Sequence, residues 1–287
     1  MTAPQGNERQ ARVVVLTGYG LNCDRETAYA FELAGAVAHR VHINTLIAGE
    51  VLLSDYDILV FDGGFSWGDD HGAGVLEAVR FRSNMGEALN RFIEEGKLVI
   101  GICNGFQAMV NLGLLPGFDK DYETRRVALT SNDCGNFRDD WVTLLANATS
   151  PCVFTKGIAS LEIPVRHGEG KLYAPPEVTE RLMAQQQVVL QYATPQGELA
   201  QGRFPYNPNG SVHDIAGICD PTGRIFGLMP HPEALNHWTN HPDWTRTKAL
   251  MKRKGHPMPS DSSEPSEPTM GVKIFKNAVD YMRETHG

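Results

Sequence analysis

Lys97-Leu-Val-Ile-Gly-Ile-Cys-Asn-Gly-Phe-Gln107 is the stretch of this sequence that is most specific for a fold. The apolar run at 98–100 predicts a buried strand, which breaks directly into a turn around Cys103. Glycines two residues before and two residues after this cysteine leave room for a sharp strand-to-helix turn, the nucleophile elbow. Apolar residues then recur at helical spacing between Gly105 and Gly113. The stretch therefore predicts a strand, an elbow and a helix.

Cys103 is the first candidate for a reactive group. A helix that begins directly behind it points its positive end and its unpaired backbone N–H groups at the sulfur, which lowers the thiol pKa and favours the thiolate. A buried structural cysteine beside two loop glycines is the alternative interpretation. The strand before Cys103 and the helix after it favour a nucleophile, because both flanking elements of the elbow are present.

The first part of the chain alternates apolar runs with amphipathic stretches, a pattern typical of parallel strands covered by helices. Beyond Leu115 short β-rich runs predict an antiparallel extension. We therefore expect an α/β fold, with a flavodoxin-like open, mostly parallel sheet flanked by helices and an antiparallel β extension. The expected strands are 12–16, 37–43, 58–61, 99–100, 126–130, 141–145, 188–192, 214–219 and 224–229, and the expected helices are 24–33 and 75–94.

A polar segment interrupts this pattern near the C-terminus. Residues 245–270 are rich first in lysine and arginine and then in serine, proline and glutamate, a composition too polar to build a core. They predict an exposed insertion. Residues 271–283 place apolar side chains on one helical face, which predicts a final helix that packs on the body. We expect residues 1–287 to form a single domain.

Composition narrows the possible functions. The formal net charge of −8 argues against nucleic acid as a partner, because nucleic-acid binders concentrate positive charge. No apolar run reaches the roughly 20 residues of a membrane span, and the N-terminus is polar rather than signal-like. The five cysteines are scattered, which indicates neither a disulfide framework nor a zinc site. These features predict a cytoplasmic protein without a metal that binds small molecules or another protein.

His231-Pro-Glu233 is the best candidate for the base that a cysteine nucleophile needs. The residue before a proline favours extended geometry, and residues i and i+2 of an extended chain point to the same side. A carboxylate beside the imidazole fixes its orientation and stabilises the imidazolium that forms when the cysteine loses its proton. Such a tripeptide is usually an ordinary loop, but its position after the apolar strand that ends at Met229 favours a catalytic pair.

Two adjacent glycines, Gly63 and Gly64, follow the expected strand at 58–61. At the carboxyl end of a strand they allow backbone N–H groups to turn into the crevice and stabilise an oxyanion. Gly64 and Phe65 are the expected donors, and the N–H of Asn104, directly after the nucleophile, would complete the oxyanion hole. An ordinary β-turn is the alternative. Phosphate binding is disfavoured because no Lys-Ser/Thr pair follows the glycines.

Together these motifs resemble a class I, triad-type glutamine amidotransferase. The resemblance rests on Gly101-Ile-Cys-Asn-Gly-Phe-Gln107, on the paired glycines before it and on His231-Pro-Glu233 after it. Further blocks, spread over nearly the whole chain, are similar to the glutaminase subunits of phosphoribosylformylglycinamidine synthase, an enzyme of purine biosynthesis. These blocks are Asn22-Cys-Asp-Arg25, Gly63-Gly-Phe-Ser-Trp-Gly-Asp69, His167-Gly-Glu-Gly170, Asn207-Pro-Asn-Gly-Ser211, Asp214-Ile-Ala-Gly-Ile-Cys219 and Gly227-Leu-Met-Pro-His-Pro-Glu233.

The resemblance implies a reaction and a set of roles. Cys103 would attack the side-chain amide of L-glutamine, His231 would protonate the departing ammonia and then activate water, and Glu233 would orient His231. The side chain of Gln107 and the backbone of residues 63–65 would hold the substrate or its oxyanion. A separate ATP-dependent synthetase subunit would use the ammonia, with ATP and Mg²⁺, to make formylglycinamidine ribonucleotide. This chain shows no Walker A motif, so we expect no cofactor in it.

Several residues depart from this pattern or compete with it. Asp62 stands where the family commonly has proline, and it adds negative charge near a site that must stabilise an oxyanion. His167 is a second, weaker candidate for the base. His237 and His241 have a spacing that would place two imidazoles on one helical face, but no third metal ligand is evident. Cys23 lacks a glycine elbow, so we expect it to pack near the site.

Two other functions stay open at this level. The chain would also fit the glutaminase subunit of another amidotransferase, or a different cysteine hydrolase on a flavodoxin-like scaffold, because a fold does not determine its chemistry. A noncatalytic interaction subunit is disfavoured, since a binding role requires no intact set of Cys103, His231 and Glu233.

Overall fold

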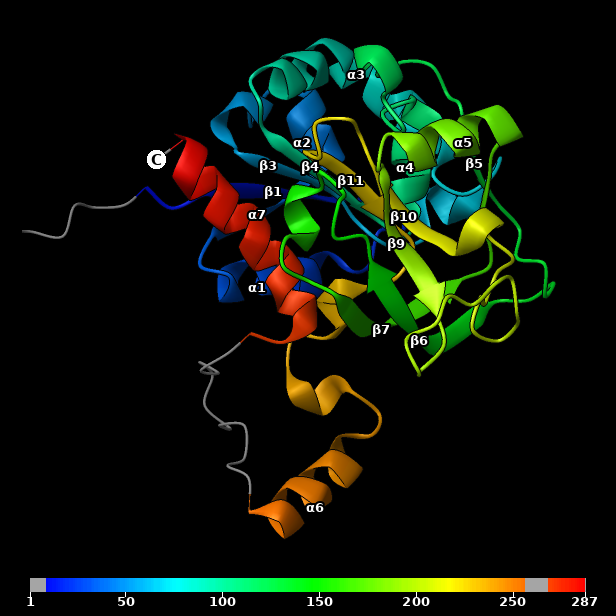
Figure 1. Ribbon diagram of the computed structural model, residues 1–287. Coiled ribbons are helices and arrows are strands. Elements are labelled where there is room, and N and C mark those ends of the chain that lie inside the picture. Colours follow the sequence, from blue (N-terminus) through cyan, green and yellow to red (C-terminus); the bar gives the residue numbers. More distant parts are fainter. Residues whose placement is uncertain (1–8, 256–267, 287) are drawn as a thin grey trace, which may run out of the picture.

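A nine-stranded mixed sheet forms the centre of the protein in a computed structural model that describes residues 9–255 and 268–286 (Figure 1). The strands follow one another across the sheet in the order β2 (Val37–His42), β1 (Arg12–Thr17), β3 (Ile58–Phe61), β4 (Leu98–Ile102), β11 (Ile225–Leu228), β10 (Ile215–Cys219), β9 (Val188–Ala193), β6 (Arg138–Ala146) and β7 (Ser160–His167). The pairs from β2 to β11 are parallel. Those from β11 to β7 are antiparallel. The expected fold class is confirmed.

The parallel strands in the middle of the sheet are buried on both faces. Every residue of β3 and of β4 is buried, which explains why their sequences are continuously apolar rather than alternating. β4 pairs in parallel with β3 on one side and with β11 on the other. The carboxyl ends of these three strands therefore lie at the same edge of the sheet, and each is followed by one of the predicted site segments.

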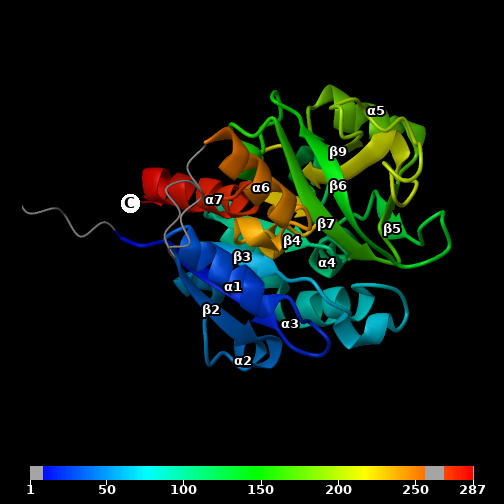
Figure 2. The ribbon, with the colours of Figure 1, turned by 90° about the horizontal axis from the view of Figure 1, so that it is seen from below.

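Helices cover both faces of the sheet (Figures 1 and 2). α1 (Asp24–Leu33) and α7 (Met270–His286) pack against each other, and the rings of Phe31 and Phe275 meet edge to face with 4.8 Å between their centroids. α3 (Val75–Glu94) and α4 (Asn104–Leu112) pack against each other on the opposite face, as right-handed crossovers require when successive connections run in opposite directions across a parallel sheet. The remaining helices are α2 (Ile43–Ile47), α5 (Pro176–Ala184) and α6 (Trp244–Lys254).

The antiparallel part differs from the sequence-based expectation in four elements. The strand expected at 126–130 does not join the main sheet, because β5 (Ala128–Thr130) pairs with β8 (Lys171–Tyr173) in a separate two-stranded sheet. The sequence patterns also do not predict β7, β8 or α5. β7 is an edge strand that contains Pro164 and exposes charged residues, and such strands lack the apolar pattern that identifies a central strand.

The helix α6 lies in the segment expected to be an insertion, and it projects from the body of the protein (Figure 1). None of its residues is buried, and it ends at Gly255. Residues 256–267 of the expected insertion lie outside the described residues, so its limits stay a prediction. Within residues 9–255 and 268–286, no helix is long and apolar enough to cross a membrane.

Candidate active site

Cys103 lies at the turn between β4 and α4 with φ 51° and ψ −106°. A non-glycine residue with positive φ is uncommon, and such strained backbone is concentrated at functional sites. Neither flanking glycine has room for a side chain. A Cβ on Gly101 would lie 2.3 Å from the sulfur of Met109, and a Cβ on Gly105 would lie 1.9 Å from the carbonyl oxygen of Phe61. The predicted elbow is confirmed.

His231 and Glu233 follow β11, which lies beside β4 in the sheet. The backbone N–H of His231 donates to the carbonyl of Pro164 at 2.8 Å, so the edge strand β7 holds this segment in place. Nδ1 of His231 and Oε1 of Glu233 lie 2.5 Å apart, and both side chains are almost completely buried. The structure thus brings the imidazole and the carboxylate together, as the spacing of the tripeptide predicts.

The charge state of His231 depends on its two acidic neighbours. Burial opposes a charged imidazole, but the negative charges of Glu233 and of the Cys103 sulfur outweigh it and raise the pKa of His231 well above its usual 6.5. Nε2 of His231 is buried and has no hydrogen-bond partner among the described residues. Since Nδ1 already faces Glu233, Nε2 is the ring atom left for the proton of Cys103. This arrangement places a base beside the candidate nucleophile.

The loop after β3 carries Gly63, Gly64 and Phe65. A Cβ on Gly64, whose φ is 148°, would lie 2.6 Å from the carbonyl oxygen of Gly20, so only glycine fits there. The N–H of Phe65 donates to that same Gly20 carbonyl at 2.9 Å. In this conformation Phe65 is therefore engaged elsewhere and does not serve as an oxyanion donor. Asn104 is the first residue of α4, where backbone N–H groups lack partners within the helix.

The side chains of Asn104 and Gln107 tie α4 to two loops. Asn104 Nδ2 donates to Oε1 of Gln107 and to Oδ1 of Asp69, each at 3.1 Å, and its Oδ1 accepts from the Ser66 N–H at 3.1 Å. Gln107 Nε2 donates to the carbonyl of Glu169 at 2.5 Å. The expected contact of Gln107 with substrate stays a prediction. In the sequence, the only signal of this cross-linking role is that these residues belong to family-like blocks.

Asp62, the departure from the family pattern, is completely buried. Its Oδ1 accepts a hydrogen bond from Thr27 Oγ1 at 2.9 Å. Burial and the nearby charge of Glu233 raise the pKa of Asp62 well above its usual range. The raised pKa favours the uncharged carboxyl group, so Asp62 opposes an oxyanion less than the sequence alone suggests.

His167, the weaker candidate for the base, lies buried at the end of β7. Its Nδ1 lies 3.1 Å from Oδ1 of Asn132. Burial and the charge of His231 lower the pKa of His167 to about 3. An imidazole with so low a pKa does not take up a thiol proton, which favours His231 over His167 as the base.

His237 and His241 make separate contacts. Nδ1 of His237 lies 2.7 Å from Oγ1 of Thr239, and Nε2 of His241 lies 3.3 Å from a carboxylate oxygen of Glu162. The described residues bring no third metal-ligating side chain to these two imidazoles. Their spacing in the sequence therefore does not correspond to a metal site.

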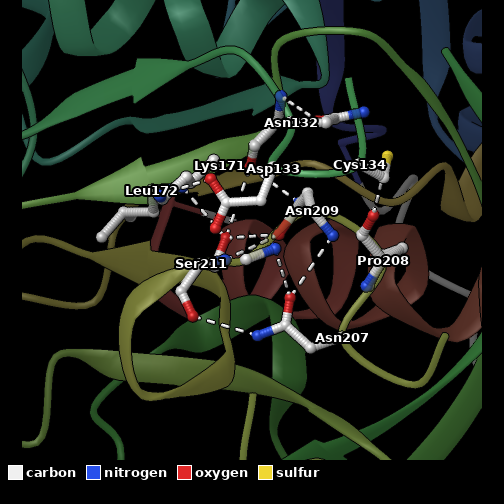
Figure 3. A network of polar contacts seen from close by, with 11 residues as sticks. Asn132, Asp133, Cys134, Lys171, Leu172, Asn207, Pro208, Asn209 and Ser211 are labelled. Carbon is white, nitrogen blue, oxygen red and sulfur yellow. Dashed lines mark hydrogen bonds and ion pairs between the residues drawn. The ribbon is translucent and has the colours of Figure 1, made fainter. Parts of the chain in front are cut away.

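A polar network joins two loops of the antiparallel part to the short strand β8 (Figure 3). Lys171 Nζ lies 2.7 Å from Oδ1 of Asp133, whose N–H donates to the carbonyl of Asn209 at 3.0 Å. The N–H of Leu172 donates to Oγ of Ser211 at 3.0 Å. The family-like block that contains Asn209 and Ser211 thus has a structural role, because it holds neighbouring loops together.

Cys23 lies directly before α1 and beside the imidazole of His231. The distance from Cys23 Sγ to His231 Nδ1 is 4.0 Å. Burial raises the pKa of Cys23 to about 11, so this thiol stays protonated at neutral pH. The expectation that Cys23 packs near the site is confirmed, although the sequence does not reveal which atom it approaches.

Comparison with known proteins agrees with this geometry. The family model of a CobB/CobQ-like glutamine amidotransferase domain matches residues 10–282. A Methanococcus maripaludis protein named phosphoribosylformylglycinamidine synthase subunit PurQ is 45% identical over 273 residues, which cover 95% of this chain and 98% of the relative. A Dehalococcoides mccartyi protein of the same name is 44% identical over 275 residues, which cover 96% of this chain and 99% of the relative.

Solved structures show the same relationship. A chain in the structure of PurLQS from Thermotoga maritima is 28% identical, with a TM-score of 0.66 and coverage of 96% of this chain and 100% of that chain. A glutamine amidotransferase from Thermotoga maritima shares the fold at 15% identity, with a TM-score of 0.52 and the same coverage of both chains. The chain therefore belongs to the family of CobB/CobQ-like glutamine amidotransferase domains and, within it, to the phosphoribosylformylglycinamidine synthase subunits PurQ.

Proposed function

We propose that this chain is the glutaminase subunit of a phosphoribosylformylglycinamidine synthase, which hydrolyses L-glutamine to L-glutamate and ammonia for purine biosynthesis. The observation that carries the proposal is the elbow itself, which holds Cys103 on a strained turn beside His231. Glu233 holds the other ring nitrogen of His231 at 2.5 Å. The names of the full-length relatives, at 44–45% identity, support the substrate and the pathway.

The triad performs the reaction in two stages. The thiolate of Cys103 attacks the carboxamide carbon of glutamine, and His231 gives its proton to the departing ammonia. A glutamyl thioester remains on Cys103. His231 then takes a proton from water, which attacks the thioester and releases glutamate. Glu233 holds the ring orientation and stabilises the imidazolium throughout.

Backbone N–H groups stabilise the tetrahedral oxyanion of both stages. We assign this role to Gly64 and Asn104, which lie at the ends of neighbouring strands. Phe65 joins them only when its N–H leaves the carbonyl of Gly20, to which it donates at 2.9 Å. The loss of a single oxyanion donor of this kind lowers the rate by about 10²- to 10³-fold. The orientation of the loop that carries Gly64 and Phe65 therefore sets the basal activity. Gln107 is assigned a substrate contact, in addition to its contact with Glu169.

The ammonia is consumed by a separate ATP-dependent synthetase subunit, which binds the ATP and Mg²⁺, while this chain holds no cofactor. A cluster of exposed aromatic rings supports docking over the site: Tyr19, Phe65 and Phe137 are 46%, 44% and 50% exposed. The Phe65 and Phe137 rings lie 6.2 Å apart between centroids. Exposed apolar clusters of this kind mark interaction surfaces, and this one includes the oxyanion loop.

The chain is proposed to work as one domain in the cytoplasm. The parallel and antiparallel strands share one continuous sheet, which supports a single domain. All five cysteines are free thiols, which suits a reducing compartment.

A glutaminase assay tests the proposal. Full-length protein releases glutamate from glutamine slowly alone and faster with its synthetase partner, and Cys103→Ala lowers this activity by about 10³-fold or more. Cys134→Ser is the matched control, because it changes a half-buried thiol outside the triad. Undiminished hydrolysis by Cys103→Ala contradicts the mechanism. Turnover of another amide or ester by Cys103, without turnover of glutamine, assigns the chain to a different class of cysteine hydrolase.

A further inference from the structure

Cys23 lies against the catalytic pair but has no part in the proposed reaction. The backbone N–H groups of Asn22 and Cys23 both donate to the carbonyl of Gly63, at 3.1 and 3.3 Å, and so place Cys23 beside the site. Its half-buried Sγ lies 4.0 Å from Nδ1 of His231. Nδ1 is the nitrogen that faces Glu233, so sulfur, imidazole and carboxylate meet on the side of the ring away from Nε2.

Gly63 makes this approach possible. A Cβ at this position would lie 3.1 Å from Sγ of Cys23 and 3.2 Å from Cε1 of His231. Any side chain at residue 63 would therefore crowd the space in which the thiol and the imidazole meet. The loop after β3 thus carries a residue that leaves this space open.

The three side chains fit the ligand set of a zinc ion. One ligand atom from each of Cys23, His231 and Glu233 lies within 4.8 Å of the others. Thiolate, imidazole and carboxylate bind Zn²⁺ at about 2.0–2.3 Å, which places tetrahedral ligands roughly 3.5 Å apart. The sulfur–nitrogen distance of 4.0 Å has to close slightly, and the nitrogen–oxygen distance of 2.5 Å has to open by about 1 Å. Water takes the fourth position.

Charge balance favours such a site in the protein interior. A thiolate and a carboxylate together offset both positive charges of the ion, so no net charge is buried. A thiol binds Zn²⁺ only as the thiolate, so binding displaces the Cys23 proton to solvent and the affinity for the metal rises with pH.

We propose that Cys23, His231 and Glu233 form an inhibitory Zn²⁺ site, in which the metal binds Nδ1 of His231 in place of the proton that this nitrogen donates to Glu233. The remaining imidazole proton then lies on Nε2. Because Nε2 has no lone pair in this state, it does not accept the proton of Cys103, and hydrolysis stops. Metal binding itself does not depend on the proposed function, whereas the inhibition rests on it.

Cobalt binding tests the site independently of activity. Co²⁺ is titrated into the full-length Cys103→Ala variant, which removes the catalytic thiol as a competing ligand. We expect a thiolate-to-cobalt charge-transfer band that saturates at one ion per chain, strengthens with pH and disappears when Zn²⁺ is added. Adding Cys23→Ser to this background removes the band, whereas adding Cys134→Ser leaves it.

Cys134 is a suitable control because its Sγ is also half-buried but contacts the carbonyls of Asn136 and Pro208, at 3.5 and 3.6 Å (Figure 3). If Cys103→Ala shows no band, or if the band survives Cys23→Ser, the proposed site is wrong. Circular dichroism and unfolding midpoints establish that each variant is folded.

Inhibition is measured on the complete complex with the synthetase. Cys23→Ser and Cys23→Ala raise the Zn²⁺ concentration for half-inhibition of glutamate release by about tenfold or more, since even outer-shell changes weaken metal sites by 10- to 100-fold. Cys134→Ser keeps the wild-type sensitivity, and a chelator restores activity. Equal sensitivity of wild type and Cys23 variants overturns the inference, because zinc then acts without Cys23. A complex without glutaminase activity refutes the proposed function, and the cobalt band still decides the metal site.

Discussion

The parallel and antiparallel halves of the sheet contribute to the candidate site in different ways. In the parallel half, β3, β4 and β11 end at one edge, and they deliver the glycine loop, Cys103 and the His231–Glu233 pair. In the antiparallel half, side chains such as Asn132 bond to backbone groups of neighbouring loops. The parallel half thus supplies the reacting groups, whereas the antiparallel half supplies the loops packed around them.

Strand direction explains this division. Parallel strands all end at the same edge, so segments far apart in the chain meet there without further arrangement. Antiparallel neighbours end at opposite edges, and their loops need side-chain hydrogen bonds to hold them beside a site formed elsewhere. Changes in the parallel half should therefore affect chemistry or the packing of the elbow, and changes in the antiparallel half should affect loop stability.

The two buried histidines, one from each half, provide the largest contrast. His231→Ala is expected to lower glutaminase activity by about 10³-fold or more, because the base for Cys103 is lost. His167→Gln is expected to stay within about tenfold of wild type, since an imidazole whose pKa is lowered to about 3 takes up no proton during turnover. Steady-state rates of both variants with the synthetase measure the difference. A larger loss of activity in His167→Gln than in His231→Ala would mean that the catalytic base lies in the antiparallel half.

The elbow glycine provides the next contrast, within the parallel half. Gly105→Ala is expected to destabilise the fold by about 3 kcal/mol, because its Cβ would overlap the carbonyl oxygen of Phe61. Gly86→Ala is the matched control, since no atom lies within 4 Å of the added Cβ in α3. Gly86→Ala should raise the free energy of unfolding by about 0.5–1 kcal/mol, because alanine has the higher helix propensity. Urea unfolding gives both values, and equal values would mean that the elbow has room for a side chain.

Asn132 tests the hydrogen bonds of the antiparallel half. Its side chain donates to the carbonyl of His167 at 2.8 Å and accepts from the N–H of Gly170 at 3.0 Å. Asn132→Ala leaves these buried groups unpaired and should lower the free energy of unfolding by about 2 kcal/mol. Asn90→Ala, on the exposed side of α3, should stay within about 0.5 kcal/mol of wild type. Similar unfolding midpoints for the two variants would show that the loops do not depend on this side chain.

Asp62→Asn tests the raised pKa of Asp62, because asparagine resembles a protonated carboxyl group and stays uncharged at every pH. The folded protein keeps the Asp62 proton above the unfolded pKa of about 3.9. Wild type therefore loses stability relative to Asp62→Asn as the pH rises from about 4 toward the raised folded pKa. Urea unfolding of both proteins between pH 5 and 8 measures this difference. Parallel pH profiles would indicate that Asp62 is ionised in the fold.

The parallel half follows from the sequence better than the antiparallel half. The expected helices 24–33 and 75–94 and the strand 58–61 agree with α1, α3 and β3 residue by residue. Their apolar patterns arise from burial against a sheet whose two faces are both covered. The sequence does not predict β7, because an edge strand with a proline and exposed charges lacks a continuous apolar run. It does not predict the sheet of β5 either, because the pairing partner of a strand lies elsewhere in the chain.

Some features of the candidate site also follow from the sequence, whereas others appear only in the structure. Glycine spacing around Cys103 and the two-residue spacing of His231 and Glu233 are short-range features, so a strand, an elbow and a paired imidazole and carboxylate were readable directly from sequence. The position of Cys23 beside His231 Nδ1, the raised pKa of Asp62 and the hydrogen bond from Phe65 to Gly20 were not. Each of these depends on burial or on contact between segments far apart in the chain, and local patterns of residues do not encode either one.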